Sequence, residues 1–288
     1  MTAVPGGYTR LLGLARSVHL FPTGVVVLTT LGLALIAHRG FPTTGTLWRM
    51  FGVVLCSQIA VGSFNDYRDR HSDAISQPAK PIPSGKVEAR SVLALCQLSL
   101  VVCLLLAATF GLVPLLLVVI GMTSGLAYDL WLKPTPVSIL GYLGGFLSLV
   151  SWVWLVAGHF TPPFLLVYPA GVFLLLSVHL ANSYPDLEND RAVGQRGLAV
   201  LLGVAGTRLA IVLSFNLVAI VGTAAVIPHR SPLAEALLLV AWVLDISAVR
   251  ISRRALTNLQ SRRRLFTLLA PATALLGAGC LLTISLAS

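Results

Sequence analysis

Long apolar runs recur along the whole 288-residue chain and restrict it to one kind of fold. Of its residues, 56% are hydrophobic and only 10% are charged, and the mean hydropathy is +0.88. A water-soluble domain of this size needs far more polar surface, whereas a helix of about 20 apolar residues crosses the ~30 Å hydrocarbon layer of a bilayer. The sequence therefore predicts an all-α polytopic membrane protein.

Hydropathy divides the chain into about nine expected transmembrane helices. Tight breaks rather than long loops separate the third from the fourth, at Gly111 and Pro114, and the fifth from the sixth, at Pro162 and Pro163. The expected spans lie near residues 18–38, 48–66, 91–110, 112–129, 138–158, 163–183, 204–228, 233–250 and 265–286.

Basic residues are distributed unevenly between the two sets of loops. Apart from Arg39, Arg49 and Arg230, the 20 Lys and Arg residues lie at the N-terminus or after spans two, four, six and eight. The positive-inside rule places that set in the cytoplasm. We therefore expect an inner- or plasma-membrane protein with a cytoplasmic N-terminus and its C-terminus on the opposite side. The net charge of +10 indicates topology and not nucleic-acid binding, because apolar spans separate the basic residues.

Two short polar stretches repeat one spacing of side chains. Positions i, i+4 and i+8 of a helix share nearly one face, so each stretch can present a row of oxygen atoms to one space. Oxygen ligands of this kind suit a hard divalent cation, most simply magnesium held together with substrate phosphate. A solvated acidic helix end does not require such a pattern. The first row is Asn65, Asp69 and Asp73, and the second is Asn182, Asp186 and Asp190.

Three loops on the expected cytoplasmic side surround these carboxylates with cations, namely Lys80, Lys133, Arg191 and Arg196. Carboxylates ringed by cations at a membrane cavity suggest a phosphorylated lipid, whose head lies on magnesium and Lys or Arg while its tail lies between the helices. Fixed positive charge also stabilises a diphosphate as its carbon–oxygen bond breaks. Metal-assisted prenyl transfer inside a membrane is the reaction that this arrangement favours.

These motifs resemble those of the UbiA superfamily of intramembrane prenyltransferases, in order and over essentially the whole chain. The matching elements are the first row, the run Lys80-Pro81-Ile82-Pro83-Ser84-Gly85, Tyr128 with Lys133, and the second row running into Arg191 and Arg196. The resemblance implies a bundle of about nine transmembrane helices around a central cavity, in which two aspartate-rich motifs bind prenyl diphosphate through Mg²⁺.

Carried over position by position, the resemblance assigns metal binding to Asn65, Asp69, Asp73, Asp186 and Asp190, and the four aspartates are also the expected catalytic residues. Further substrate-binding residues are Lys80, Lys133 and Arg191, which would neutralise the diphosphate, Tyr128, which would hydrogen-bond near it, and Asn182. Members of the family usually have arginine before the Pro-Ile-Pro-Ser-Gly run, where this chain has Lys80. Lysine keeps the positive charge but lacks the forked guanidinium that can bind an anion through two donors. Gln195-Arg196-Gly197 occupies the position at which members of the family more often have Gly-Lys-Arg-Thr.

The expected organisation is a single transmembrane prenyltransferase domain, residues 1–288, with two four-helix halves and a ninth helix. Its partners would be a prenyl diphosphate donor, a lipophilic or aromatic acceptor such as a quinone precursor, and the bilayer. Asp69 to Ile75 is similar to (bacterio)chlorophyll synthases, and Tyr184 to Arg191 to menaquinone-type members. Transfer to a chlorophyll-type or glycerol-lipid acceptor therefore stays open, as does a membrane terpene cyclase. A non-enzymatic lipid carrier ranks last, because the acids cluster on one side of the membrane.

Four other polar residues allow a structural interpretation. Asp245 either faces the interior with a functional role or pairs with Arg250. His179 is expected to pack in the bundle rather than to line the cavity. Arg16 and His19 begin span one, where a positive-inside anchor explains them as well as contact between Arg16 and an acceptor does.

Overall fold

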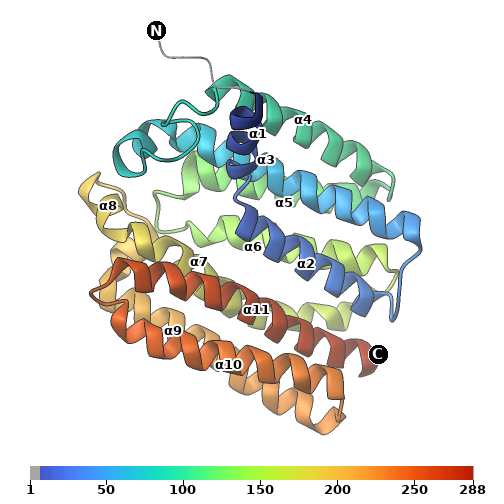
Figure 1. The fold of residues 1–288 in the computed structure, drawn as a ribbon. Coiled ribbons are helices and arrows are strands. Elements are labelled where there is room, and N and C mark those ends of the chain that lie inside the picture. The colour runs from blue at the N-terminus through green and yellow to red at the C-terminus, as the bar shows by residue number, and fades with distance from the viewer. Residues whose placement is uncertain (1–6, 288) are drawn as a thin grey trace.

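The computed structural model describes residues 7–287, and every regular element in that range is a helix. The long helices lie side by side, with the N-terminal ones above the C-terminal ones in Figure 1. They are α2 (Leu20–Ala37), α3 (Thr44–Ser76), α4 (Ala89–Ala108), α5 (Leu112–Ala127), α6 (Ile139–Val156), α7 (Tyr168–Ser183), α9 (Leu198–Val226), α10 (Pro232–Arg254) and α11 (Leu259–Ala287). The short elements are α1 (Gly7–Arg16), η1 (Tyr128–Leu132), η2 (Pro162–Val167), η3 (Tyr184–Asp186), α8 (Leu187–Ala192) and η4 (Ile227–His229).

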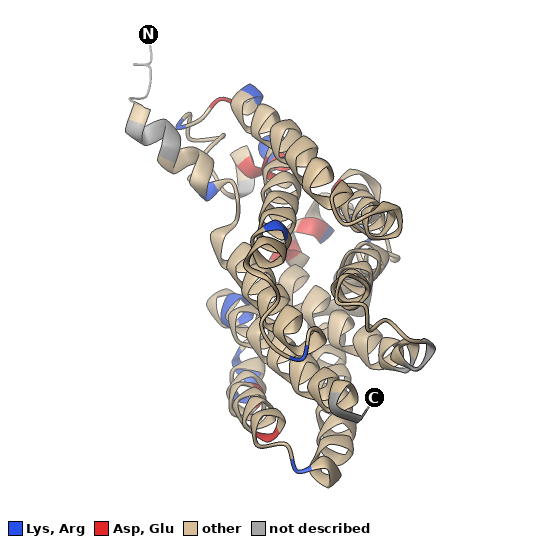
Figure 2. Cartoon of the chain, turned by 90° about the vertical axis from the view of Figure 1, so that its right-hand side faces the viewer, with Lys and Arg blue, Asp and Glu red and all other residues tan. Residues whose placement is uncertain are grey.

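Eight helical segments of the described chain are long and apolar enough to cross a membrane. Most of the ribbon is uncharged (Figure 2), and outward-facing side chains such as Leu28, 72% exposed, suit contact with lipid. The expected sixth span, 163–183, is not among these eight; it corresponds to η2 and α7, and α7 has only 16 residues. The chain is therefore an integral membrane protein as predicted, and the expected count of nine spans is approximate.

Glycines with positive φ mark one helix boundary and one kink within a helix. Gly111, with φ 101°, makes the tight turn between α4 and α5 that the sequence predicted, while Pro114 lies inside the first turn of α5. Gly203, with φ 68° and ψ 178°, kinks α9 next to residue 204, where that span was expected to begin. Glycine adopts these angles without the clash that a Cβ would cause.

The first polar row lies on one uninterrupted helix. The Oγ1 of Thr43 caps α3 by accepting a hydrogen bond from the amide of Thr46 at 3.3 Å, and the helix then runs for 33 residues. It continues about three turns beyond the expected end of the span at residue 66. Asn65, Asp69 and Asp73 consequently share one face, as their spacing predicted.

The second polar row lies on three successive elements. Asn182 lies near the end of α7, Asp186 ends the 3₁₀ turn η3, and Asp190 lies in the six-residue α8. Pro185 lies within η3, and proline lacks the amide hydrogen that a continuing α-helix needs. The expectation that this row lies on one regular helix is therefore wrong.

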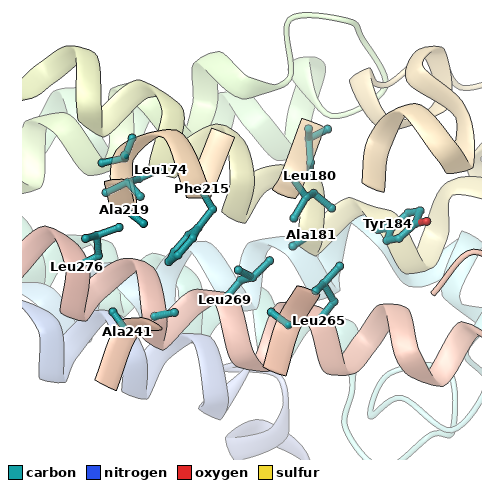
Figure 3. Packing of buried hydrophobic residues seen from close by; sticks show 14 of the residues in the cluster. Leu174, Leu180, Ala181, Tyr184, Phe215, Ala219, Ala241, Leu265, Leu269 and Leu276 are labelled. Atoms are coloured by element: carbon teal, nitrogen blue, oxygen red, sulfur yellow. The ribbon is translucent and has the colours of Figure 1, made fainter. Parts of the chain in front are cut away.

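Buried apolar side chains form two clusters. One cluster lies among the five helices from α2 through α6 and includes Met50, Cys103 and Trp152. The other lies among α7, α9, α10 and α11. In the second cluster Phe215 and Leu269 lie between the helices, and Tyr184 lies at its end (Figure 3). The predicted repeat of four helices is not tested by this packing and stays a prediction.

Candidate active site

A cavity of about 1540 Å³ lies among α2, α3, α5, α6, α7, α9 and α11. Most of its lining is apolar, and its acidic residues come from the end of α3 and from the segments that follow α5 and α7. Both polar rows therefore face one shared space. The lining includes nine of the ten predicted site residues, namely Asn65, Asp69, Asp73, Lys80, Tyr128, Lys133, Asn182, Asp186 and Asp190.

Lys133 contacts the first row from the segment after η1. Its ammonium forms an ion pair with Oδ2 of Asp69. The Nδ2 of Asn65 donates to Oδ1 of Asp129 at 2.7 Å and to Oδ2 of Asp69 at 3.4 Å. Asp129 is buried, and its Oδ2 has no hydrogen-bond partner among the described residues. This carboxylate, for which no role was predicted, lines the cavity beside Tyr128.

Lys80 links two carboxylates of α3. Its Nζ lies 2.8 Å from Oδ2 of Asp73 and 3.3 Å from Oδ1 of Asp66, and that Oδ1 also lies 3.1 Å from Nε2 of His19. Burial alone would lower the pKa of Lys80, but the two carboxylates raise it overall, so its ammonium stays charged. Asp66 and His19 are further residues of the site, and neither was a predicted site residue.

The carboxylates of the second row carry negative charge that bound cations would stabilise. Burial, reinforced by the charge of Asp186, raises the pKa of Asp190 to about 6. Burial also raises the pKa of Asp186, although Lys133 and Lys80 act in the opposite direction. Asn182 has a different contact, because its Nδ2 donates to the hydroxyl of Tyr142 at 2.9 Å.

Arg191 lies elsewhere than expected. Its Nη2 donates to the carbonyl oxygen of Val200 at 3.2 Å, and the residue is not part of the cavity lining. The short α8 is followed closely by α9, and the Arg191 side chain lies against the start of that helix near Gly203. Neutralisation of a diphosphate by Arg191 therefore has no support from this arrangement.

An aromatic wall borders the polar end of the cavity. The rings of Tyr128 and Tyr142 meet edge to face with centroids 5.5 Å apart, and His179 lies 4.8 Å from Tyr142. His179 is buried, and its Nε2 lies 2.9 Å from Oγ of Ser138. It packs behind the two tyrosines and does not line the cavity, as expected.

An ion pair connects the second row to the turn between α10 and α11. The guanidinium of Arg262 contacts both carboxylate oxygens of Glu188, at 2.6 and 2.9 Å, and its Nε donates to the carbonyl of Ala255 at 2.8 Å. The same guanidinium lies over the ring of Tyr184, 4.9 Å from its centroid. Arg262 thereby holds both η3 and α8, which carry Asp186 and Asp190.

The Glu188→Gln variant is expected to have a lower melting temperature than the wild type at pH 7 but not in acid. The hydrogen bond from Arg262 lowers the pKa of Glu188, so its stabilising effect is complete above the usual carboxyl pKa and is lost as pH falls through the folded-state value. Melting curves from pH 7 down to about pH 3, below the model-peptide value, measure this.

Glu235→Gln is the matched control, because that glutamate is exposed in the first turn of α10. It should change the melting temperature far less than Glu188→Gln does. An equal difference for Glu188→Gln at pH 7 and pH 3 would contradict the assigned ion pair.

The donor atoms of the cavity fit magnesium bound together with a phosphate. Within residues 7–287, no three His, Cys, Asp or Glu side chains form a ready metal cage. Magnesium does not require one, since it is commonly held by one or two carboxylates, substrate phosphate and water. The half-buried carboxylates of Asp186 and Asp190, with raised pKa values, supply such ligands.

The fold and the cavity together define a helical integral membrane protein with an acidic, cation-bordered site at one end of an apolar cavity. The chain belongs to the UbiA prenyltransferase family, whose model matches residues 25–270. The apo structure of a UbiA homolog from Aeropyrum pernix superimposes with a TM-score of 0.72 at 19% identity, covering 88% of this chain and 95% of that one. A homolog from Archaeoglobus fulgidus bound to GPP and Mg²⁺ gives 0.66 at 15% identity, covering 91% and 99%.

Sequence relatives carry names of several prenyl-transfer reactions. Digeranylgeranylglyceryl phosphate synthase of Korarchaeum cryptofilum is 32% identical over 54% of this chain and 56% of its own length. The bacteriochlorophyll synthase 34 kDa chain of Chloroflexus aurantiacus is 31% identical over 54% and 51%. 4-Hydroxybenzoate octaprenyltransferase of Photobacterium profundum is 27% identical over 63% and 65%. The chain thus spans about half the length of the first two relatives.

Proposed function

We propose that this protein transfers a prenyl group from a polyprenyl diphosphate to an electron-rich, lipophilic or aromatic acceptor, and that it depends on Mg²⁺. The observation that carries the proposal is the division of one cavity into an apolar part and a charged end. A prenyl diphosphate has the same division, because its tail is apolar and its head is anionic. Membership of the UbiA prenyltransferase family supports this assignment.

The two polar rows are proposed to hold the metal ions and, through them, the diphosphate. The ligands would be Asn65, Asp69, Asp73, Asp186 and Asp190. Bound magnesium would supply Lewis-acid stabilisation of the charge that develops on the departing diphosphate.

Lys80 and Lys133 would add fixed positive charge on the same side of the diphosphate. Both lysines line the cavity and form ion pairs with carboxylates of the first row. Fixed charges placed before the reaction stabilise the transition state without reorganisation.

The aromatic wall is proposed to face the allylic carbon. Ionisation of the carbon–oxygen bond leaves positive charge on the prenyl group, and aromatic faces attract cations. Tyr128 and Tyr142 line the cavity, and Asn182 fixes the hydroxyl of Tyr142. In this proposal Asn182 acts by positioning the aromatic wall. The apolar remainder of the cavity would exclude water, which otherwise captures the cation.

The active-site end is proposed to face the cytoplasm. Both polar rows, Lys80 and Lys133 lie beside the loops that contain most of the basic residues, and such loops stay on the cytoplasmic side. Labelling single cysteines placed in the 77–88 loop with a membrane-impermeant thiol reagent, in a background without the native cysteines, would test this orientation.

The reaction is tested with purified protein, Mg²⁺ and geranylgeranyl diphosphate, with each acceptor class that the relatives' names suggest. These are 4-hydroxybenzoate, geranylgeranylglyceryl phosphate and a bacteriochlorophyll precursor. Mass spectrometry should find one prenylated acceptor. This product should form only when Mg²⁺ is present, and a chelator should abolish its formation. A cyclised hydrocarbon from the donor alone would indicate a terpene cyclase instead. An intact donor with every acceptor would contradict the proposal.

A further inference from the structure

The junction between α1 and α2 places a histidine at the wall of the cavity. His19 precedes α2 with φ 54° and ψ 62°, a left-handed conformation that is uncommon for a residue other than glycine. The junction packs closely on α3, because a Cβ at Gly62 would lie 3.0 Å from the carbonyl oxygen of Val18 and 3.5 Å from Cδ2 of His19. Strained backbone of this kind is often found at functional sites.

A buried carboxylate orients the imidazole of His19. Nε2 lies 3.1 Å from Oδ1 of Asp66, whose side chain is 4% exposed, while 34% of the His19 side chain is exposed. Lys80 contacts the same oxygen at 3.3 Å, so Asp66 accepts and Nε2 carries the hydrogen. Nδ1 then has the free lone pair. A carboxylate fixes the tautomer of a catalytic histidine in the same way in hydrolases.

Among the charged groups around the cavity's polar end, Asp129, whose Oδ2 has no hydrogen-bond partner among the described residues, is the one that competes with His19 for a proton from an acceptor. Lys80 and Lys133 are already protonated and paired with carboxylates. The aspartates of the two rows are assigned above to the metal ions and the diphosphate. His19 lines the cavity outside both rows, and neutral imidazole is a base near pH 7.

We propose that His19 is the general base of the transfer reaction, an inference that rests on the proposed prenyl transfer. The bond between C1 of the donor and its diphosphate oxygen breaks, and the electron pair leaves with the diphosphate. An electron pair of the acceptor forms the new bond to C1. The attacking acceptor atom then loses its proton to Nδ1 of His19, while Asp66 stabilises the imidazolium that results.

His19 also lines a second pocket, through which the proton would leave in this proposal. This pocket has a volume of about 340 Å³ and lies between α1, α3 and the loop that follows α3. His19 and Lys80 line both this pocket and the main cavity. The charged groups that share it with the imidazole are Arg16, Asp66 and Lys80. Water in the pocket would exchange protons with the ring after each turnover.

The His19→Gln variant separates proton removal from donor chemistry, because glutamine can still donate to Asp66 but is not a base. With geranylgeranyl diphosphate, Mg²⁺ and the acceptor that the wild type uses, kcat for transfer should fall about 100- to 1,000-fold. Cleavage of the donor by water without an acceptor should fall by a clearly smaller factor than transfer does, since ionisation comes before proton removal. Unchanged transfer, or an equal fall of both rates, would overturn the inference.

Chemical rescue supplies a second readout in the His19→Gly variant. Glycine tolerates the left-handed backbone and leaves space for a small base. Added imidazole should raise the transfer rate of this variant at least about tenfold, within the contribution expected of a general base. Pyrazole, which has nearly the same shape but is far less basic, should not raise it. Equal effects of the two compounds would contradict a role as base.

The outcomes also separate this inference from the proposed function. If the wild type neither cleaves nor transfers the donor, the proposed function fails. If the wild type transfers the prenyl group and His19→Gln does so at the same rate, only the role of His19 fails.

Discussion

Replacement of Asp69 or Asp186 by asparagine is expected to lower kcat for prenyl transfer about a thousandfold or more, because an essential metal ligand stabilises the transition state by several kcal/mol. Asparagine keeps the shape of each side chain but removes the charge that would hold a divalent cation. The two residues come from different rows and line the same cavity, so each loss should be large alone. Product formation at saturating donor and Mg²⁺ measures the effect.

Asp245→Asn is the matched control for these two variants. Asp245 is also a buried carboxylate in a membrane helix, but it lies outside the cavity lining, and Nδ2 of Asn216 donates to it at 3.5 Å. Its replacement should leave kcat within about threefold, because no transition-state contact is lost. Asp186→Asn should not unfold the protein either, since it removes a half-buried negative charge that partial burial already disfavours, as the raised pKa of Asp186 indicates. Full turnover by Asp69→Asn or Asp186→Asn would refute the assigned roles.

Replacement of Lys80 by methionine is expected to damage both the fold and the activity. Asp66 and Asp73 are almost fully buried and both contact the Lys80 ammonium. Removing one partner of a buried ion pair costs about 3–5 kcal/mol of folding free energy. Because the lysine is partly exposed and solvent screens its charge, we expect a loss at the lower end of this range. The loss of a fixed cation should also lower kcat/KM for the donor about 100-fold.

Two variants serve as controls for Lys80→Met. Lys80→Arg keeps the positive charge and should retain activity within about tenfold, the change allowed for altered geometry. Lys86→Met removes a lysine from the same loop that does not line the cavity, and it should leave stability and kcat/KM unchanged. If Lys80→Arg were as inactive as Lys80→Met, charge would not be the property that matters. Thermal melting and donor-dependent rates distinguish these cases.

Local spacing was sufficient to predict much of this site. The first row follows from the helical period alone, and α3 preserves that period to its last turns. The second row contains a proline between its first two members, and Pro185 is the signal that it could not be one regular helix. The cations after α3 and η1, Lys80 and Lys133, line the cavity because short loops keep them close to the rows, and their role in substrate binding stays a prediction.

Residues whose place depends on packing between distant segments could not be predicted in this way. Asp66 lies one position after Asn65 and belongs to the site through Lys80 and His19, which come from other elements. Asp129 is brought to Asn65 by the π-helical turn η1, which hydropathy does not reveal. The contact of Arg191 with the start of α9 likewise depends on how closely α8 and α9 follow each other.

The length of α7 has a consequence for the membrane around the protein. The 16 residues of α7, counted without the 3₁₀ turn η2 that precedes them, span about 24 Å, which is several ångströms less than the ~30 Å apolar slab of a typical bilayer. Hydrophobic mismatch of this size is relieved by local thinning of the lipid layer or by a polar end that sinks below the headgroup plane. Either response would lower the second row toward the acyl chains, so an isoprenoid substrate could present its head without leaving the leaflet.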